Sequence, residues 1–122
     1  MNDTHINNIN KTEIPIITAT AQLYKLFYKY LELFPKKDKY ALGAKCEGYI
    51  IALLELLLSY GSAEIDKRKS IVRSASVKLD ALKIFIRLCR ELKILDDKKY
   101  LELQKYLQDI GKQIGGWMKF LS

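Results

Sequence analysis

The stretch LDALKIFIRLCREL at residues 79–92 separates apolar from basic side chains in a way that decides the fold. At about 100° per residue, Leu82 and Ile86 fall on one arc of a helix, whereas Lys83 and Arg87 fall on another. The same spacing continues toward the N-terminus and predicts one amphipathic helix from about residue 63 or 66 to residue 93. Its expected core face consists of Ile71, Ala75, Leu79, Leu82, Phe85, Ile86, Cys89 and Leu92.

Prolines and cap residues set the limits of the two helices that come before. Pro15 suits a first helical turn, and the first helix is predicted to run from there until Pro35 ends it. Asp38 is expected to act as the N-cap of a second helix. That helix is predicted to reach about Tyr60, with Gly61 at its C-cap.

The remaining segment and the length of the chain complete the architecture. A fourth helix is predicted from an Asp96 cap to about residue 120. The 122 residues have room for one domain, and no segment alternates like a strand. Short links between helices favour antiparallel neighbours. We therefore predict an all-α, antiparallel up-down four-helix bundle over residues 15–122, preceded by a polar, mobile arm at residues 1–14.

Two apolar clusters point to packing surfaces. Residues 49–58 are apolar nearly all round, which predicts a helix buried on more than one side, and one explanation is a subunit interface. The aromatic residues of the first helix could stack on nucleic-acid bases, but their helical spacing favours core or interface packing. They are Tyr24, Phe27, Tyr28, Tyr30 and Phe34.

Basic residues form lines on the outer faces of the last two long helices. The net charge is +7, and lysines of the fourth helix recur every seven residues, so they drift by only about 20° per step. Asp80 and Glu91 dilute the line of the preceding helix. A plain solvated surface is one reading; a phosphate-binding surface, favoured by counterion release, is the other and the one we prefer. The two lines consist of Lys69, Arg73, Lys83, Arg87 and Arg90, and of Lys98, Lys105, Lys112 and Lys119.

The sequence predicts no catalytic, cofactor or metal site. His5 is the only histidine and lies in the predicted arm, so no histidine triad or multi-histidine metal site can form. Cys46 and Cys89 are expected to be small buried hydrophobes. The polar N-terminus lacks a secretory signal and no apolar run is long enough for a membrane span, so we expect a cytoplasmic protein.

Three further positions call for an explanation. Gly111 and Gly115 lie on one face of the fourth helix, and we expect them to permit close helix packing, because glycine costs helix stability. Trp117 is expected to anchor the end of the bundle. Lys78 falls inside an apolar arc, where it should either extend toward water or pair with an acid.

Three stretches resemble the Avd family, the accessory variability proteins of diversity-generating retroelements. Residues 34–43 (FPKKDKYALG) are similar to the family's proline-and-base turn. Residues 82–92 (LKIFIRLCREL) are similar to its Leu-Arg-x-x-x-Arg-Leu segment, and residues 110–119 (IGKQIGGWMK) to its Gly-base-x-x-Gly-Gly-Trp ending. The similarity covers about residues 20–120, and the last motif is the most specific. The family belongs to a wider group of small four-helix bundles that includes the 23S rRNA intervening-sequence proteins.

The resemblance implies a non-catalytic accessory protein that forms a basic, barrel-like homopentamer. It implies association with a reverse transcriptase and its template RNA during mutagenic cDNA synthesis. Lys83, Arg87 and Lys112 match basic positions of the family and are the first candidates for nucleic-acid contact. Arg73, Arg90, Lys105 and Lys119 are candidates from the lines of charge alone. The alternative is a structural or protein-interaction bundle of the intervening-sequence type.

Overall fold

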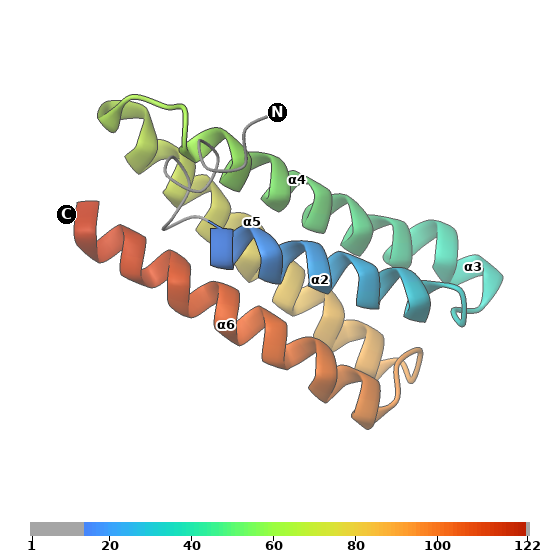
Figure 1. The fold of residues 1–122 in the computed structure, drawn as a ribbon. Helices are drawn as coiled ribbons and strands as arrows, with labels where there is room; N and C mark the ends of the chain where they lie inside the picture. Colours follow the sequence, from blue (N-terminus) through green and yellow to red (C-terminus); the bar gives the residue numbers. More distant parts are fainter. Residues whose placement is uncertain (1–13, 122) are drawn as a thin grey trace, which may run out of the picture.

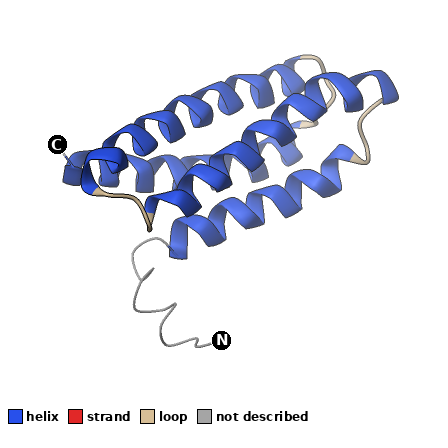
Figure 2. Cartoon of the chain, turned by 90° about the horizontal axis from the view of Figure 1, so that it is seen from above, coloured by secondary structure: helices blue, strands red, loops and turns tan. Residues whose placement is uncertain are grey.

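The computed structural model describes residues 14–121, so the arm predicted at residues 1–14 lies outside the described residues except for Ile14. Within that range, successive long helices lie side by side and run in opposite directions (Figure 1), and none of the described residues forms a strand (Figure 2). The predicted all-α four-helix bundle is confirmed. The elements are α2 (Ile14–Leu31), α3 (Lys36–Asp38), the π-helical turn η1 (Lys39–Gly43), α4 (Ala44–Tyr60), α5 (Ile65–Glu91) and α6 (Asp97–Leu121).

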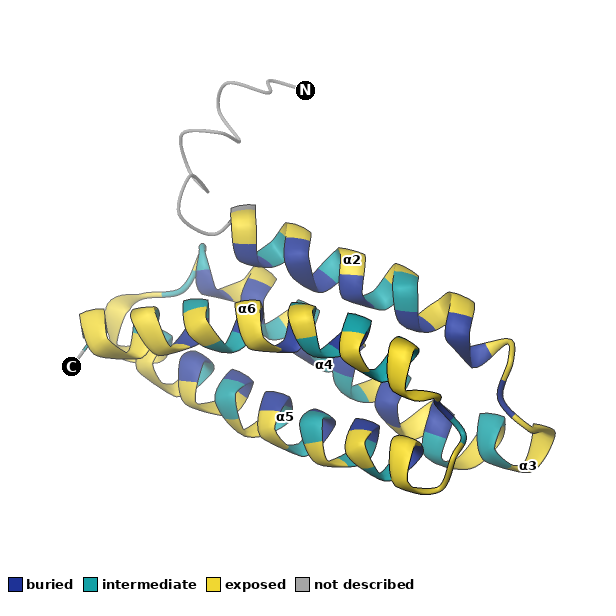
Figure 3. Ribbon diagram, turned by 90° about the horizontal axis from the view of Figure 1, so that it is seen from below, coloured by how far each residue is buried: buried dark blue, intermediate teal, exposed yellow. Residues whose placement is uncertain are grey.

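The helices form a closed set of neighbours around one core. α4 packs on α2 and α5, and α6 packs on α5 and α2. Figure 3 shows buried positions turned toward the interior of the bundle and exposed positions on its outer faces. Phe27, Leu53, Leu82 and Leu107, one from each long helix, are fully buried. Apolar residues at helical spacing therefore build the core as the sequence predicts.

The predicted core face of α5 is right except at its end. Leu92 is 64% exposed, because α5 ends at Glu91 and the chain turns away. Lys93 adopts a left-handed φ of 64°, and the N–H groups of Ile94 and Leu95 both donate to the carbonyl oxygen of Cys89. Val72, which the arc left out, is buried.

The predicted N-cap of the second helix is wrong. The helical run begins at Lys36, and the side chain of Asp38 makes no capping hydrogen bond. Instead, the carbonyl oxygen of Pro35 accepts hydrogen bonds from the N–H groups of Asp38 and Lys39, at 2.9 and 2.8 Å. Proline lacks an N–H group and suits this position ahead of a helix.

Gly43 lets the end of α2 pack closely against the π-helical turn. A Cβ atom at Gly43 would lie 2.5 Å from Cδ1 of Leu31 and 3.1 Å from Cδ2 of Phe34. Both neighbours are buried, so glycine is required for this approach. The sequence analysis did not predict the π-helical turn, which ends at this close contact.

Two other predicted caps are confirmed, whereas α2 ends at Leu31, before Pro35, and α5 ends at Glu91, two residues before the predicted end. Oδ1 of Asp96 accepts a hydrogen bond of 2.8 Å from the N–H group of Lys99, which caps α6 and holds the pKa of the Asp96 carboxyl below its usual value. Gly61 occupies the C-cap of α4 in a right-handed conformation. There Arg68 satisfies carbonyl groups by donating to Gly61 and Ala63, at 3.2 and 2.9 Å.

Several single-residue predictions also have clear outcomes. Cys46 and Cys89 are free and buried, and a hydrogen bond to Cys89 together with burial raises the pKa of Cys46. Trp117 stacks on Tyr60 with ring centroids 4.1 Å apart, which anchors the end of α6. Lys78 extends over the ring of Tyr49, with Nζ 5.6 Å from the centroid.

The aromatic residues of α2, and Phe34 in the link after it, pack mainly as predicted. Phe27, Tyr30 and Phe34 are buried, and Tyr24 donates a hydrogen bond of 3.1 Å to Glu47 on α4. Tyr28, by contrast, is 53% exposed. No helix between residues 14 and 121 is both long and apolar enough to cross a membrane.

Candidate nucleic-acid interface

A groove of about 660 Å³ runs between α5 and α6 on the outer side of the bundle. The two helices are antiparallel neighbours, so residues far apart in sequence meet along it. Lys83 comes from α5, and Lys105 and Lys112 come from α6. The remaining lining residues are Ser76, Leu79, Asp80, Gln108, Asp109, Gly111, Ile114, Gly115 and Met118.

Gly111 sets the position of the Lys83 side chain. The point that a Cβ atom would occupy on Gly111 lies 3.3 Å from Nζ of Lys83 and 3.3 Å from Cδ2 of Leu79. Lys83 is half-buried, and its ammonium group lies against Gly111 on α6, where a Cβ atom would make a tight contact. The packing role predicted for Gly111 is therefore confirmed.

Gly115 behaves differently from the prediction. No atom lies within 4 Å of the point where its Cβ atom would be, and the residue is exposed. The expectation that Gly115 permits close helix packing is wrong. Its missing side chain instead leaves the backbone of α6 bare on the wall of the groove.

The three groove lysines, Lys83, Lys105 and Lys112, form no ion pair within residues 14–121. Two acids also line the groove, one on each helix: Asp80 and Asp109. Asp109 accepts a hydrogen bond of 3.3 Å from Gln113 and is not paired with a described lysine. The cations thus remain available to an external anion, and the acids reduce but do not cancel their excess.

The other predicted contact residues are spread along the same two helices. Arg87 is exposed one turn beyond Lys83 on α5. Arg73 borders a separate cavity of about 170 Å³, together with Lys69 and the apolar residues Val72, Met118 and Leu121. Lys119 is exposed near the end of α6. The structure therefore brings Lys83, Lys105 and Lys112 together and leaves these three in separate positions.

Arg90 is already engaged by neighbouring side chains. Its Nε donates to Oδ1 of Asp97 at 3.0 Å, and its guanidinium lies 4.8 Å from the ring centroid of Tyr100. Both partners belong to α6, just after the turn that follows α5. Arg90 thus stabilises the junction of the two helices, and a phosphate would have to compete with Asp97.

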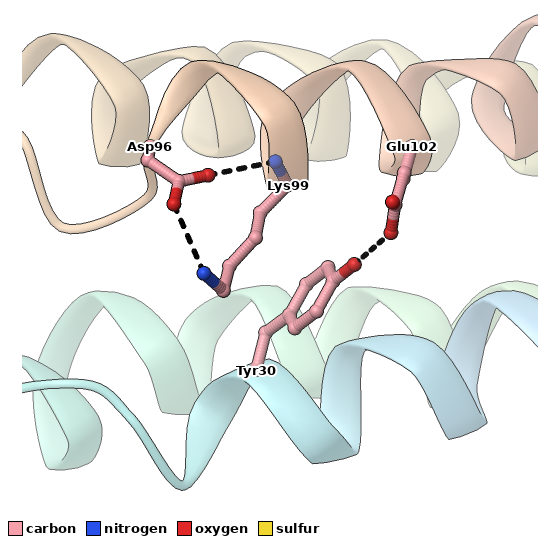
Figure 4. A network of polar contacts seen from close by, with 4 residues as sticks. All are labelled: Tyr30, Asp96, Lys99 and Glu102. Carbon is pink, nitrogen blue, oxygen red and sulfur yellow. Dashed lines mark hydrogen bonds and ion pairs between the residues drawn. The ribbon is translucent and has the colours of Figure 1, made fainter.

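A polar network at the same end of the bundle fixes α6 against α2 (Figure 4). The hydroxyl of Tyr30 donates to Oε2 of Glu102, and Nζ of Lys99 donates to Oδ2 of Asp96 at 3.0 Å. Burial raises the pKa of Tyr30 to about 12, and the hydrogen bond to Glu102 is the second cause of this shift. The hydrogen bond from Tyr30 to Glu102 joins α2 to α6, and the pair of Lys99 with Asp96 lies at the start of α6.

Sequence reasoning missed Gln108 and Ser76 as groove residues, and it assigned Gly115 the wrong role. Gln108 lies three residues after Lys105, which is the only signal that could have placed it on the same face. For metals, residues 14–121 contain no group of three or more His, Cys, Asp or Glu side chains able to hold an ion.

The fold and the groove define a class: a small basic four-helix bundle with an unpaired cationic groove between its last two helices. A comparison with known protein families matches residues 16–121 to the family described as bAvd-like. Because the match covers most of the chain, the protein belongs to the bAvd-like family. Neither a curated protein nor a solved structure matches the chain.

Proposed function

We propose that this protein is a non-catalytic accessory protein that binds nucleic acid through the groove between α5 and α6. The observation that carries the proposal is the convergence of Lys83, Lys105 and Lys112, none of them ion-paired among the described residues, on one groove. Each phosphate that such a lysine neutralises releases condensed counterions, which supplies affinity without reading sequence. Arg87 extends the surface by one turn, and Arg73, Arg90 and Lys119 are secondary contacts.

Family membership indicates the setting in which this binding acts. Avd-type proteins serve diversity-generating retroelements, so we propose that the partners are a reverse transcriptase and its template RNA, in the cytoplasm. The phosphate groups of RNA, of cDNA and of their hybrid present the same chemistry to the lysines. A pull-down with a retroelement reverse transcriptase, repeated after nuclease treatment, tests whether the enzyme is contacted directly.

Self-assembly is a separate part of the proposal. Ile51 and Leu58 on α4 are 43% and 56% exposed, and Val77 and Ile84 on α5 are 67% and 50% exposed. Large apolar side chains on two neighbouring helices support a homo-oligomer, for which the family implies a pentamer. Light scattering should give a mass several times that of the 14.2 kDa chain, and a monomer at micromolar concentration would contradict this part.

The same exposed residues favour one alternative, a protein-interaction bundle of the 23S rRNA intervening-sequence type. That alternative places function on the apolar faces of α4 and α5 and gives the groove lysines no role. It predicts that neutralising Lys83, Lys105 and Lys112 leaves partner binding intact.

Fluorescence anisotropy at low salt tests the binding proposal. The wild-type protein should bind a labelled structured RNA and a labelled DNA duplex. The variant Lys83→Ala/Lys105→Ala/Lys112→Ala should lose about tenfold or more in affinity. The matched control, Lys36→Ala/Lys37→Ala/Lys39→Ala, removes the same charge from α3 and η1 and should lose much less. Equal losses, or no wild-type binding, would contradict the proposal.

A further inference from the structure

Two of the three glycines of α6 lie where close packing does not require them. Gly111, Gly115 and Gly116 fall within six residues of one helix, and each costs up to about 1 kcal/mol of helix stability relative to alanine. A Cβ atom at Gly115 or at Gly116 would meet nothing within 4 Å. Gly115 lines the groove and Gly116 does not, although both are exposed. At Gly115, the space that a side chain would fill is part of the groove itself.

The chemistry of the groove suits a nucleic-acid backbone and not bases. Proteins that hold single strands stack the bases on aromatic side chains within a basic channel. Of the described residues that line the groove, none is aromatic. The most exposed aromatic rings, those of Tyr40 and Phe120 at 73% and 84%, belong to other surfaces. A single-stranded nucleic acid would therefore have no aromatic side chain in the groove on which to stack its bases.

The groove instead has cations on both walls, and an open backbone at Gly115 on the α6 wall. Lys83 projects from α5, and Lys105 and Lys112 follow one another on α6 about 10 Å apart along the helix axis. The line of lysines on α6 continues beyond the groove to Lys98 and Lys119 and spans about 32 Å, close to the roughly 34 Å of one duplex turn. A double helix keeps its bases inside and presents its phosphates as a stiff ridge.

We propose that the groove between α5 and α6 receives the sugar-phosphate ridge of a double-stranded nucleic acid, with Gly115 leaving the space that the ridge enters. This inference rests on the proposed function and narrows it from nucleic acid in general to duplexes. Lys83, Lys105 and Lys112 contact phosphates of the seated backbone. Gly115 acts by its missing side chain, and Gly111 acts by leaving room for the Lys83 ammonium group.

A pair of neighbouring substitutions tests this geometry. Gly115→Leu places a side chain in the groove, whereas Gly116→Leu adds the same side chain to the same helix outside it. Both replace glycine in a helix and should raise the thermal midpoint, which circular dichroism verifies. The probes are a labelled RNA duplex of about 24 base pairs, roughly two turns, and one of its strands chosen without self-complementarity.

The expected result is selective. Gly115→Leu should weaken duplex binding by about tenfold, and should change single-strand binding by less than about threefold. Gly116→Leu should leave both affinities within about twofold of wild type. The comparison between the variants is decisive because a duplex, with its higher charge density, favours any basic surface to some degree.

Failures of the inference and of the proposed function give different patterns. If both probes bind and Gly115→Leu affects neither, or affects both equally, nucleic-acid binding stands and the duplex geometry is overturned. Tighter binding of the single strand than of the duplex also overturns it. If neither probe binds the wild-type protein at low salt, the proposed function falls and the inference falls with it.

Discussion

Charged residues at the start of α6 have side-chain or backbone partners, whereas the groove lysines farther along the helix have no ion-pair partner among the described residues. At its start, Asp96 caps the helix, Glu102 accepts a hydrogen bond from Tyr30, and Asp97 pairs with Arg90. Along residues 105–118, the groove lysines have no ion-pair partner among the described residues. One helix therefore carries an anchored segment, residues 97–103, and a groove segment, residues 105–118.

The two segments differ in whether their charged side chains are already engaged by other parts of the protein. In the anchored segment, side chains of α2, α5 and α6 satisfy one another, so a ligand would have to break existing contacts. In the groove segment, Gly115 and Gly116 leave the backbone open, and the groove lysines have no ion-pair partner among the described residues. Under the proposed function, contacts that stabilise the bundle and contacts to nucleic acid lie in different segments of one helix.

Core truncations should show the largest contrast between the segments. Leu103 and Ile114 are buried at 0% and 2% exposure, one in each segment. Leu103→Ala should cost about 3–4 kcal/mol of unfolding free energy, because its surroundings are held on all sides. Ile114 lies beside the groove, where its surroundings can relax into the space left by truncation. Ile114→Ala should therefore cost about 2 kcal/mol of unfolding free energy. Urea unfolding gives both values, and equal costs would remove the contrast.

Alkaline pH should weaken the anchored segment specifically. The pKa of Tyr30 is raised from 10.0 to about 12, so the folded protein holds this proton while the unfolded chain releases it. The stabilisation is complete below pH 10 and is lost as pH rises from 10 to about 12. Tyr30→Phe should lower the free energy of unfolding by about 1 kcal/mol at neutral pH. Between pH 10 and about 12, the stability of this variant should fall less steeply than that of the wild-type protein.

Urea unfolding across that pH range checks the effect of Tyr30. Tyr28→Phe is the control, because Tyr28 is 53% exposed, whereas Glu102 and Lys99 both contact Tyr30. If Tyr30→Phe and the wild-type protein lose stability in parallel, the hydrogen bond to Glu102 is not what protects the proton.

Substitutions of glycine should have opposite effects on stability at a closely packed position and at an open one. Gly116→Ala, with nothing near its new Cβ atom, should stabilise the protein by about 0.5–1 kcal/mol. Gly43→Ala places a Cβ atom 2.5 Å from Leu31 and should destabilise the protein by about 1–3 kcal/mol. Thermal melts give the signs directly. A stabilising Gly43→Ala would show that Leu31 moves aside at no cost.

The smallest expected effect concerns the acids of the groove. Asp80→Asn/Asp109→Asn removes two negative charges from its walls and should strengthen nucleic-acid binding about threefold at low salt. The control Glu55→Gln/Asp66→Asn changes the net charge equally through exposed residues elsewhere on α4 and α5. Anisotropy titrations compare the two. Equal gains would mean that overall charge, and not the groove, governs affinity.

Much of the fold follows from the sequence because helical periodicity and caps are local properties. Asp96 signals its helix start by its own side chain, whereas the start of α4 depends on Pro35 and on the packing of Gly43 against Leu31. Leu92 fits the apolar arc, but the chain turns before it can be buried. Contacts between distant segments decide both outcomes, and a single periodic pattern does not contain them.

The candidate site was predictable as two lines of charge but not as one groove. Periodicity places Lys83 and Arg90 on the same side of α5, yet only the register of α6 shows that one borders the groove and the other pairs with Asp97. A glycine is equally compatible with close packing and with open space, so Gly111 and Gly115 look alike in sequence and differ in structure.

Residue-level footprinting tests the central claim most directly. The protein, alone and saturated with an RNA duplex, is treated with an amine-reactive reagent, and modification of each lysine is measured by mass spectrometry. We predict strong protection of Lys83, Lys105 and Lys112, and little change at Lys36 and Lys37 on α3. Uniform protection of all lysines, or protection confined to α3, would contradict the assignment of nucleic-acid binding to the groove.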